Sequence, residues 1–162
     1  RRQLARTSKA PGRTRQLVVF SLPGAARLVD LPGYGYASAP RAEQARWQRL
    51  IPDYLATRRT LKGVFVLNDC RRPLQAGDLQ ALDLLAEAGR PCVMVLTKAD
   101  KLSRNAAASA RLQARKALAE WPNVLAVELF SSLQADSRRG LLDWLGRWLA
   151  VTPRRAEKNG PR

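Results

Sequence analysis

Hydrophobic positions in the first third of the chain follow two different spacings, one typical of strands and one typical of a helix. Two β-rich runs, 15–22 and 26–30, flank a Pro-Gly-Ala turn at 23–25, which predicts an antiparallel hairpin. Residues 41–57 then carry apolar side chains at helical spacing, interrupted by Pro52. Because proline removes a helical hydrogen bond, we expect this helix to be kinked near Pro52.

From residue 63 onward, apolar runs with strand character alternate with amphipathic segments. Strands that alternate with helices predict parallel strands covered by helices on both faces. The expected fold class is therefore α/β, a doubly wound, mostly parallel sheet with one antiparallel hairpin strand. The expected strands are 63–69, 91–100 and 123–130, and the expected helices are 77–89, 105–120 and 140–149. The last helix is expected to place five residues near one stripe: Leu141, Leu142, Leu145, Trp148 and Leu149.

Length and composition fit a single domain. The chain has 162 residues, of which 46% are apolar and 26% charged, as in an ordinary globular protein. Residues 151–162 are polar and basic and contain proline and glycine, so we expect a flexible basic tail after a domain that spans 1–150. No apolar run approaches the roughly 20 residues of a membrane helix, and no signal peptide is visible. Cys70 and Cys92 are too isolated for a disulfide framework, so we expect a cytoplasmic protein.

The charge and the absence of histidine narrow the chemistry. The formal net charge is +16, and the first sixteen residues hold six basic side chains and no acidic one. This imbalance predicts a polyanionic partner such as RNA, although a basic surplus also serves solubility alone. With no histidine in the chain, every Ser-His, Cys-His and His-metal mechanism is excluded. Carboxylates, lysines, hydroxyls and backbone amides are left to form any site.

The most specific pattern is T-K-A-D at 97–100, which follows a predicted strand. Ligands of doubly wound sheets bind beyond the carboxyl ends of the strands. A carboxylate at Asp100 can accept two hydrogen bonds from guanine, which offers N1–H and N2–H₂ donors, whereas adenine has an acceptor at N1. Lys98 can lay its aliphatic stem along a purine face, and the Thr97 hydroxyl can join neighbouring loops. The alternative is an ordinary polar turn after a strand.

The segment D-L-P-G at 30–33 is a weaker pattern, since D-x-x-G occurs by chance about once in two chains of this length. The sequence contains a second match at 143–146, within the predicted C-terminal helix, where Asp143 is most simply solvated. Asp30 differs because it ends a strand at the same predicted sheet edge as Asp100. There its carboxylate can hold a water of Mg²⁺, and the Gly33 amide can donate to a terminal phosphate.

Five phrases in this order resemble the translation-factor-like class of P-loop GTPases and, more closely, the EngB family of bacterial ribosome-assembly GTP-binding proteins. They are "SKAPGRTRQL", "LVDLPGYGYA", "RWQRLIPDYL", "LTKADKL" and "FSSL", and the resemblance runs from about Ser8 to Leu149. It implies slow GTP hydrolysis, a role in assembly of the large ribosomal subunit, and a requirement for normal cell division and septation. The implied partners are guanine nucleotide and the large subunit or its RNA, with no membrane, and the complete protein is expected to be a monomer.

The resemblance also implies a site for GTP or GDP with Mg²⁺. Thr14 would ligate the ion directly and Asp30 would hold it through water, while Ser131 to Leu133 would close over guanine O6 through backbone amides. No catalytic residue is firmly implied. The implied GTP-binding residues are Gly12, Arg13, Thr14, Arg15, Gln16, Asp30, Leu31, Pro32, Gly33, Thr97, Lys98, Ala99, Asp100, Ser131, Ser132 and Leu133.

The sequence departs from the family in its phosphate-binding part. Nothing in it matches G-x-x-x-x-G-K-[ST], the loop whose amides cradle the phosphates, and the family places that loop before the point where this sequence begins. We therefore expect 1–150 to be a G domain that lacks its first strand, phosphate loop and first helix, the strand belonging between those that end in Asp30 and Asp69. Ala10 stands where the family commonly has threonine, a small change.

Three interpretations remain open for the site and the chain. Tyr34 stands where many small GTPases have a glutamine that positions water, which predicts slow hydrolysis, although packing or partner contact also explains a tyrosine. The chain can alternatively be a GTPase-derived basic RNA- or ribosome-binding protein, or a gene fragment, that no longer binds nucleotide. A plain doubly wound domain that binds another small anion is the third interpretation.

Overall fold

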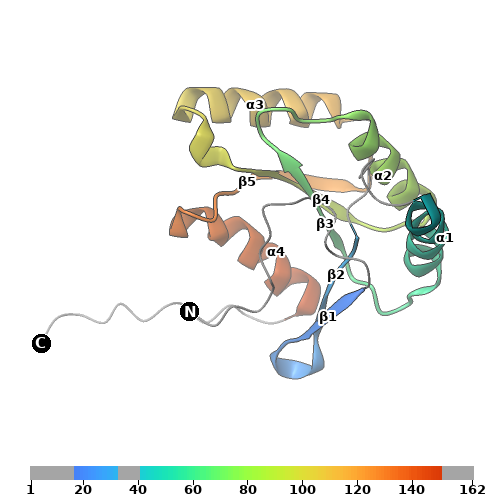
Figure 1. Cartoon of the computed structure of the whole chain (residues 1–162). Helices are drawn as coiled ribbons and strands as arrows, with labels where there is room; N and C mark the ends of the chain where they lie inside the picture. Colours follow the sequence, from blue (N-terminus) through green and yellow to red (C-terminus); the bar gives the residue numbers. More distant parts are fainter. Residues whose placement is uncertain (1–16, 33–40, 151–162) are drawn as a thin grey trace, which may run out of the picture.

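The structure is a computed structural model that describes residues 17–32 and 41–150 (Figure 1). Its strands and helices follow the order that the hydrophobic pattern predicts. The strands are β1 (Val18–Ser21), β2 (Arg27–Asp30), β3 (Val64–Asp69), β4 (Cys92–Thr97) and β5 (Val124–Leu129), and the helices are α1 (Arg41–Thr57), α2 (Ala76–Glu87), α3 (Arg104–Ala117) and α4 (Arg138–Leu149). Short 3₁₀ turns occupy Pro23–Ala25, Ala99–Lys101 and Ala135–Ser137.

Strand pairing confirms the α/β class. β3, β4 and β5 form a parallel three-stranded sheet with β4 in the centre, and β1 pairs with β2 as an antiparallel hairpin. The hairpin turns through Gly24, whose φ of 77° lies in the left-handed region that glycine adopts without a Cβ clash. Helix α1 contains Pro52 and continues to Thr57.

The main core lies between one face of the parallel sheet and helices α1, α2 and α3. Along β4, Cys92, Met94 and Leu96 point to this face, because side chains alternate along a strand. They pack in one cluster with Leu55 of α1, Leu82 and Leu85 of α2, and Ala114 and Leu118 of α3. All residues of β4 from Cys92 to Leu96 are fully buried, as expected for the central strand of a sheet covered on both faces.

Helix α4 covers the opposite face, so that α3 and α4 lie on opposite sides of the sheet (Figure 1). The ring centroid of its Trp148 lies 4.8 Å from that of Phe65 of β3, with the two ring planes tilted by 50°. Trp144 donates its indole N–H to Glu128 of β5 at 3.3 Å. The expected apolar stripe of α4 is wrong at Leu142, whose side chain is exposed. Leu142 lies about 100° around the helix from Leu141, at the margin of the expected stripe.

The hairpin and the parallel sheet are two separate sheets rather than one continuous sheet. The hairpin lies on the β3 side of the parallel sheet, away from β5 (Figure 1). Its apolar residues Val18, Val19 and Leu28 are exposed, whereas Phe20 and Val29 are half-buried. Within residues 17–32 and 41–150, no helix has the length and apolar character that a membrane crossing requires.

Candidate functional site

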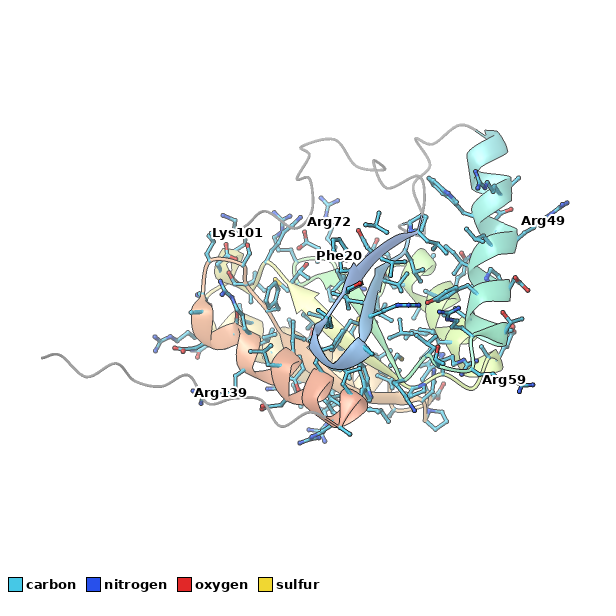
Figure 2. The ribbon with its side chains drawn as sticks, turned by 90° about the horizontal axis from the view of Figure 1, so that it is seen from below. Phe20, Arg49, Arg59, Arg72, Lys101 and Arg139 are labelled. Atoms are coloured by element: carbon cyan, nitrogen blue, oxygen red, sulfur yellow. The ribbon has the colours of Figure 1, made fainter. Side chains whose placement is uncertain are left out.

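The carboxyl ends of β3, β4 and β5 meet at one edge of the parallel sheet, where such folds bind ligands. Three polar segments leave the strands there, at 69–72, 97–101 and 130–133. Figure 2 shows Arg72 and Lys101, which belong to the segments after β3 and β4, at the same edge of the molecule. The T-K-A-D segment is therefore brought beside the segments that follow the two neighbouring strands.

Asp100 is held by a buried serine. The Ser131 hydroxyl, which has no solvent exposure, donates to Asp100 Oδ1 at 2.6 Å, and the Lys101 ammonium lies 3.5 Å from Oδ2. The hydrogen bond from Ser131 lowers the pKa of the Asp100 carboxyl, and the Lys101 charge lowers it further. An ionised carboxylate only accepts hydrogen bonds, so Asp100 presents an acceptor at the sheet edge.

The S-S-L segment after β5 has one backbone amide left for a ligand. The Ser131 N–H donates to the Ser137 hydroxyl at 3.0 Å, and the Leu133 N–H donates to the Ser131 hydroxyl at 3.1 Å. The Ser132 N–H has no partner in the part of the chain that the structure describes. Of the three amides that the resemblance assigns to guanine O6, that of Ser132 is therefore the available one.

Several contacts join the T-K-A-D segment to the end of β3. The Thr97 hydroxyl donates to the Asn68 carbonyl at 2.7 Å, and the Cys70 N–H donates to the Thr97 carbonyl at 3.0 Å. The Cys70 thiol lies 3.3 Å from the Lys98 carbonyl, and burial raises the pKa of this thiol, so it remains a donor. Thr97 thus joins neighbouring segments, the role that the sequence suggests for its hydroxyl.

Asp69, the last residue of β3, is a part of this edge that the sequence does not single out. It accepts two hydrogen bonds from the Arg71 guanidinium, at 2.9 and 2.6 Å, and one from the Lys98 ammonium at 2.9 Å. These cations, Arg71 first, hold the pKa of the Asp69 carboxyl well below its usual range. The contact between Asp69 and Lys98 follows from the strand register, because Asp69 stands opposite Thr97 across the β3–β4 pair. No local sequence pattern predicts that register.

The phosphate side of the predicted site is described only in part. Asp30 ends β2 and is exposed, and its carboxylate has no hydrogen-bonding partner within residues 17–32 and 41–150, while Leu31 is half-buried and Pro32 is buried. Such a carboxylate fits the role of holding Mg²⁺ through a water. Gly33, Tyr34 and residues 12–16, Thr14 included, lie outside the described residues. The second D-x-x-G match lies in α4, where Asp143 is exposed, as expected for a solvated side chain.

The family model and the relatives that match this chain belong to the P-loop GTPase superfamily, whose doubly wound fold the chain shares. A family model described as "50S ribosome-binding GTPase" matches residues 1–98. The relatives called "Probable GTP-binding protein EngB" include one from Edwardsiella ictaluri, 41% identical over 98% of this chain and 73% of its own length, and one from Methylococcus capsulatus, 43% identical over 98% and 75%. The chain belongs to the EngB family of GTP-binding proteins.

Solved structures agree on the fold. A crystal structure of a probable GTP-binding protein EngB matches with a TM-score of 0.65 and 16% identity, covering 85% of each chain. A bacterial selenocysteine-specific elongation factor matches with a TM-score of 0.60 and 18% identity, covering 84% of this chain and 22% of its own. At these identities the likeness supports the doubly wound fold and says nothing about the site.

Proposed function

We propose that the protein is a guanine-nucleotide-dependent switch of the EngB type, in which the segments 97–100 and 131–133 hold the base. The observation that carries this proposal is the 2.6 Å hydrogen bond by which buried Ser131 fixes the ionised Asp100 carboxylate. The carboxylate accepts N1–H and N2–H₂ of guanine side by side, which adenine cannot offer. Ser132 N–H donates to O6, and the Lys98 stem lies along the purine face.

The phosphate end of the site uses Asp30, Leu31, Pro32 and Gly33 together with residues 12–16. Asp30 would hold Mg²⁺ through water and Thr14 would ligate it directly, and the bound ion would neutralise phosphate charge. The Gly33 amide would donate to the terminal phosphate, a contact that GTP offers and GDP does not, which is how the site would distinguish the two nucleotide states. With Tyr34 in the place of a water-positioning glutamine, hydrolysis to GDP and phosphate is slow.

The nucleotide state in turn controls binding to the large ribosomal subunit or its RNA, through which the protein acts in the cytoplasm in subunit assembly and supports cell division. Support comes from the charge of +16 and from the ribosome-binding description of the family model. The second candidate is a basic RNA-binding protein that has lost nucleotide binding. RNA affinity that is equal with GDP and with a non-hydrolysable GTP analogue favours this second candidate.

The base-reading role is tested by Asp100→Asn in the protein expressed from its complete open reading frame. The oxygen of an asparagine amide accepts from N1–H, but its NH₂ group then faces the amino group of guanine, so that two donors meet. In xanthine a carbonyl oxygen takes the place of this amino group and accepts from the asparagine NH₂. We expect Asp100→Asn to lower GDP affinity by roughly 100-fold, from the loss of a charge-assisted pair, and to raise affinity for xanthosine diphosphate. Titration with fluorescent nucleotides measures both.

Asp143→Asn is the control, because it makes the same change at an exposed aspartate of α4, outside the segments 97–100 and 131–133. It is expected to leave both affinities unchanged. A wild-type protein that binds GDP and ADP equally, or an Asp100→Asn variant whose preference stays with guanine, would overturn the proposed role of Asp100.

A further inference from the structure

We propose that Asp69 is a positioning residue for the base site, which acts by fixing the ammonium of Lys98 before the nucleotide arrives. The inference rests on the proposed function, since it assigns Lys98 to the purine face. It concerns an acidic side chain on a different strand from the T-K-A-D segment. Asp69 is not expected to touch the base itself.

The contact geometry makes Asp69 a fixed anchor rather than a mobile partner. Both of its carboxylate oxygens are used, because Arg71 Nε donates to Oδ1 at 2.9 Å and Arg71 Nη2 donates to Oδ2 at 2.6 Å. The Arg71 backbone N–H adds a third bond to Oδ1 at 3.0 Å. The Lys98 ammonium approaches the same Oδ2 at 2.9 Å. A paired, planar guanidinium therefore sets where the Lys98 ammonium can sit.

The backbone of Lys98 is fixed independently of its side chain. Lys98 adopts a left-handed conformation, with φ of 59° and ψ of 32°, which is uncommon for a residue with a Cβ. Its carbonyl accepts from the Cys70 thiol at 3.3 Å, and its neighbour Thr97 is bonded to Asn68 and Cys70. The aliphatic stem of Lys98 is thus held at both ends, by the turn at its Cα and by Asp69 at its Nζ.

Holding the stem matters because a free lysine side chain has many rotamers. Ordering a lysine side chain on binding costs conformational entropy, and a side chain that is already ordered avoids part of this cost. The Asp69 side chain is 26% exposed and that of Lys98 is 56% exposed, so the ion pair is screened by water and its effect is modest. We expect the loss of Asp69 to weaken guanine nucleotide binding by roughly two- to fivefold.

A double-mutant cycle tests whether Asp69 acts through Lys98. Asp69→Asn keeps the shape of the side chain and removes its charge, and Lys98→Met keeps an unbranched apolar stem and removes the ammonium. In the protein from the complete reading frame, Asp69→Asn is expected to weaken GDP binding in the wild-type background. The same substitution in the Lys98→Met background is expected to change the affinity by less than about 1.5-fold, since no ammonium remains to be held.

Two further measurements separate positioning from a structural effect. The ratio of GDP to ADP affinity should not change in Asp69→Asn, because Asp100 and Ser131 are untouched, while the rate at which an amine-specific reagent labels Lys98 in the nucleotide-free protein should rise. Asp53→Asn, the same change on an exposed position of α1, is the matched control and should alter neither affinity nor labelling.

The outcomes are distinct for the two proposals. If wild type binds GDP but Asp69→Asn weakens it equally in both backgrounds, or not at all, Asp69 does not act through Lys98 and this inference is wrong while the proposed function stands. If wild type shows no preference for guanine nucleotides, the proposed function fails and the inference fails with it.

Discussion

At the scale of single residues, the buried Ser131 hydroxyl stabilises the ionised form of the Asp100 carboxyl by donating a hydrogen bond to it. The Ser131 hydrogen bond lowers the pKa of Asp100 from its ordinary value of 3.8. A lowered carboxyl pKa means that the interaction is fully present above that ordinary value and is lost as the pH falls through the lower value of the folded protein. Acid is therefore expected to neutralise Asp100, the proposed base-reading group, only below the usual pH range of a carboxyl.

Replacing Ser131 by alanine should raise the pH at which the Asp100 carboxyl becomes protonated. Without the hydroxyl, the Asp100 pKa rises toward 3.8, so guanine affinity begins to decline at a higher pH than in wild type. At neutral pH the affinity should fall by roughly three- to tenfold, because the carboxylate is no longer oriented. Carbon-detected titration of Asp100 and GDP binding over a pH series measure the two effects. An unchanged Asp100 titration in Ser131→Ala would contradict this account.

The residue scale also shows how far the site can be read from the sequence. Asp100 could be predicted, because T-K-A-D after a strand is a local pattern with a chemical reason. The partner Ser131 came through the family resemblance, and the contact between them depends on β4 and β5 ending side by side. Asp69 could not be predicted as a partner of Lys98, because their contact depends on the β3–β4 register and on the left-handed turn at Lys98.

At the scale of elements, the packing of α4 on β3 depends on a glycine. A Cβ at Gly63 would lie 2.3 Å from Trp148 Cε2, and two further atoms of that ring would be closer than 3.0 Å. The indole is rigid and is packed against Phe65 and Trp144, at 4.8 and 5.9 Å between ring centroids. We expect Gly63→Ala to lower the free energy of unfolding by about 1–3 kcal/mol, as overpacking does elsewhere. Urea unfolding followed by tryptophan fluorescence measures it.

Gly140→Ala provides a comparison in α4, the helix whose Trp148 contacts Gly63. A Cβ there would lie 2.8 Å from Glu128 Oε2. This atom ends a side chain that can rotate away by giving up its contacts with Trp144 and Arg111, whereas the indole ring of Trp148 is rigid. Gly140 lies in the first turn of α4, where alanine is also favoured over glycine, by up to about 1 kcal/mol. Gly140→Ala should therefore destabilise less than Gly63→Ala. Equal losses from the two substitutions would refute the explanation by ring contact.

The elements themselves were largely predictable because each has a hydrophobic period of its own. Strand β4 is one continuous apolar run, so its burial on both faces followed from the sequence, and every expected helix and strand from Arg41 to Leu149 is present. The error at Leu142 arose because periodicity alone does not fix which of two adjacent leucines faces the sheet. The sequence did not predict that the hairpin and the parallel sheet would be separate sheets. Which strands pair depends on segments far apart in the chain, and a local pattern does not contain that information.

At the scale of the whole molecule, the hairpin and the parallel sheet do not share hydrogen bonds within the described residues. The exposed Val18, Val19 and Leu28 lie on the hairpin, where apolar side chains usually pack against further structure. We expect a further strand to join these two sheets, as the resemblance to the EngB family implies. The limits of the domain stay a prediction, which a comparison between two lengths of the protein tests.

The comparison sets the 162-residue chain against the protein expressed from its complete open reading frame. A phosphate loop contributes several charge-assisted hydrogen bonds, so we expect the 162-residue chain to bind GDP at least roughly 100-fold more weakly. We also expect the amides of β1 and β2 to exchange with solvent faster in the shorter chain, because a marginal two-stranded hairpin gains protection only when it joins a larger sheet. Equal affinity, equal exchange and one cooperative unfolding transition in both proteins would show that residues 1–162 already form a complete domain. A difference in exchange confined to β1, β2 and β3 would instead locate the added strand between the two sheets.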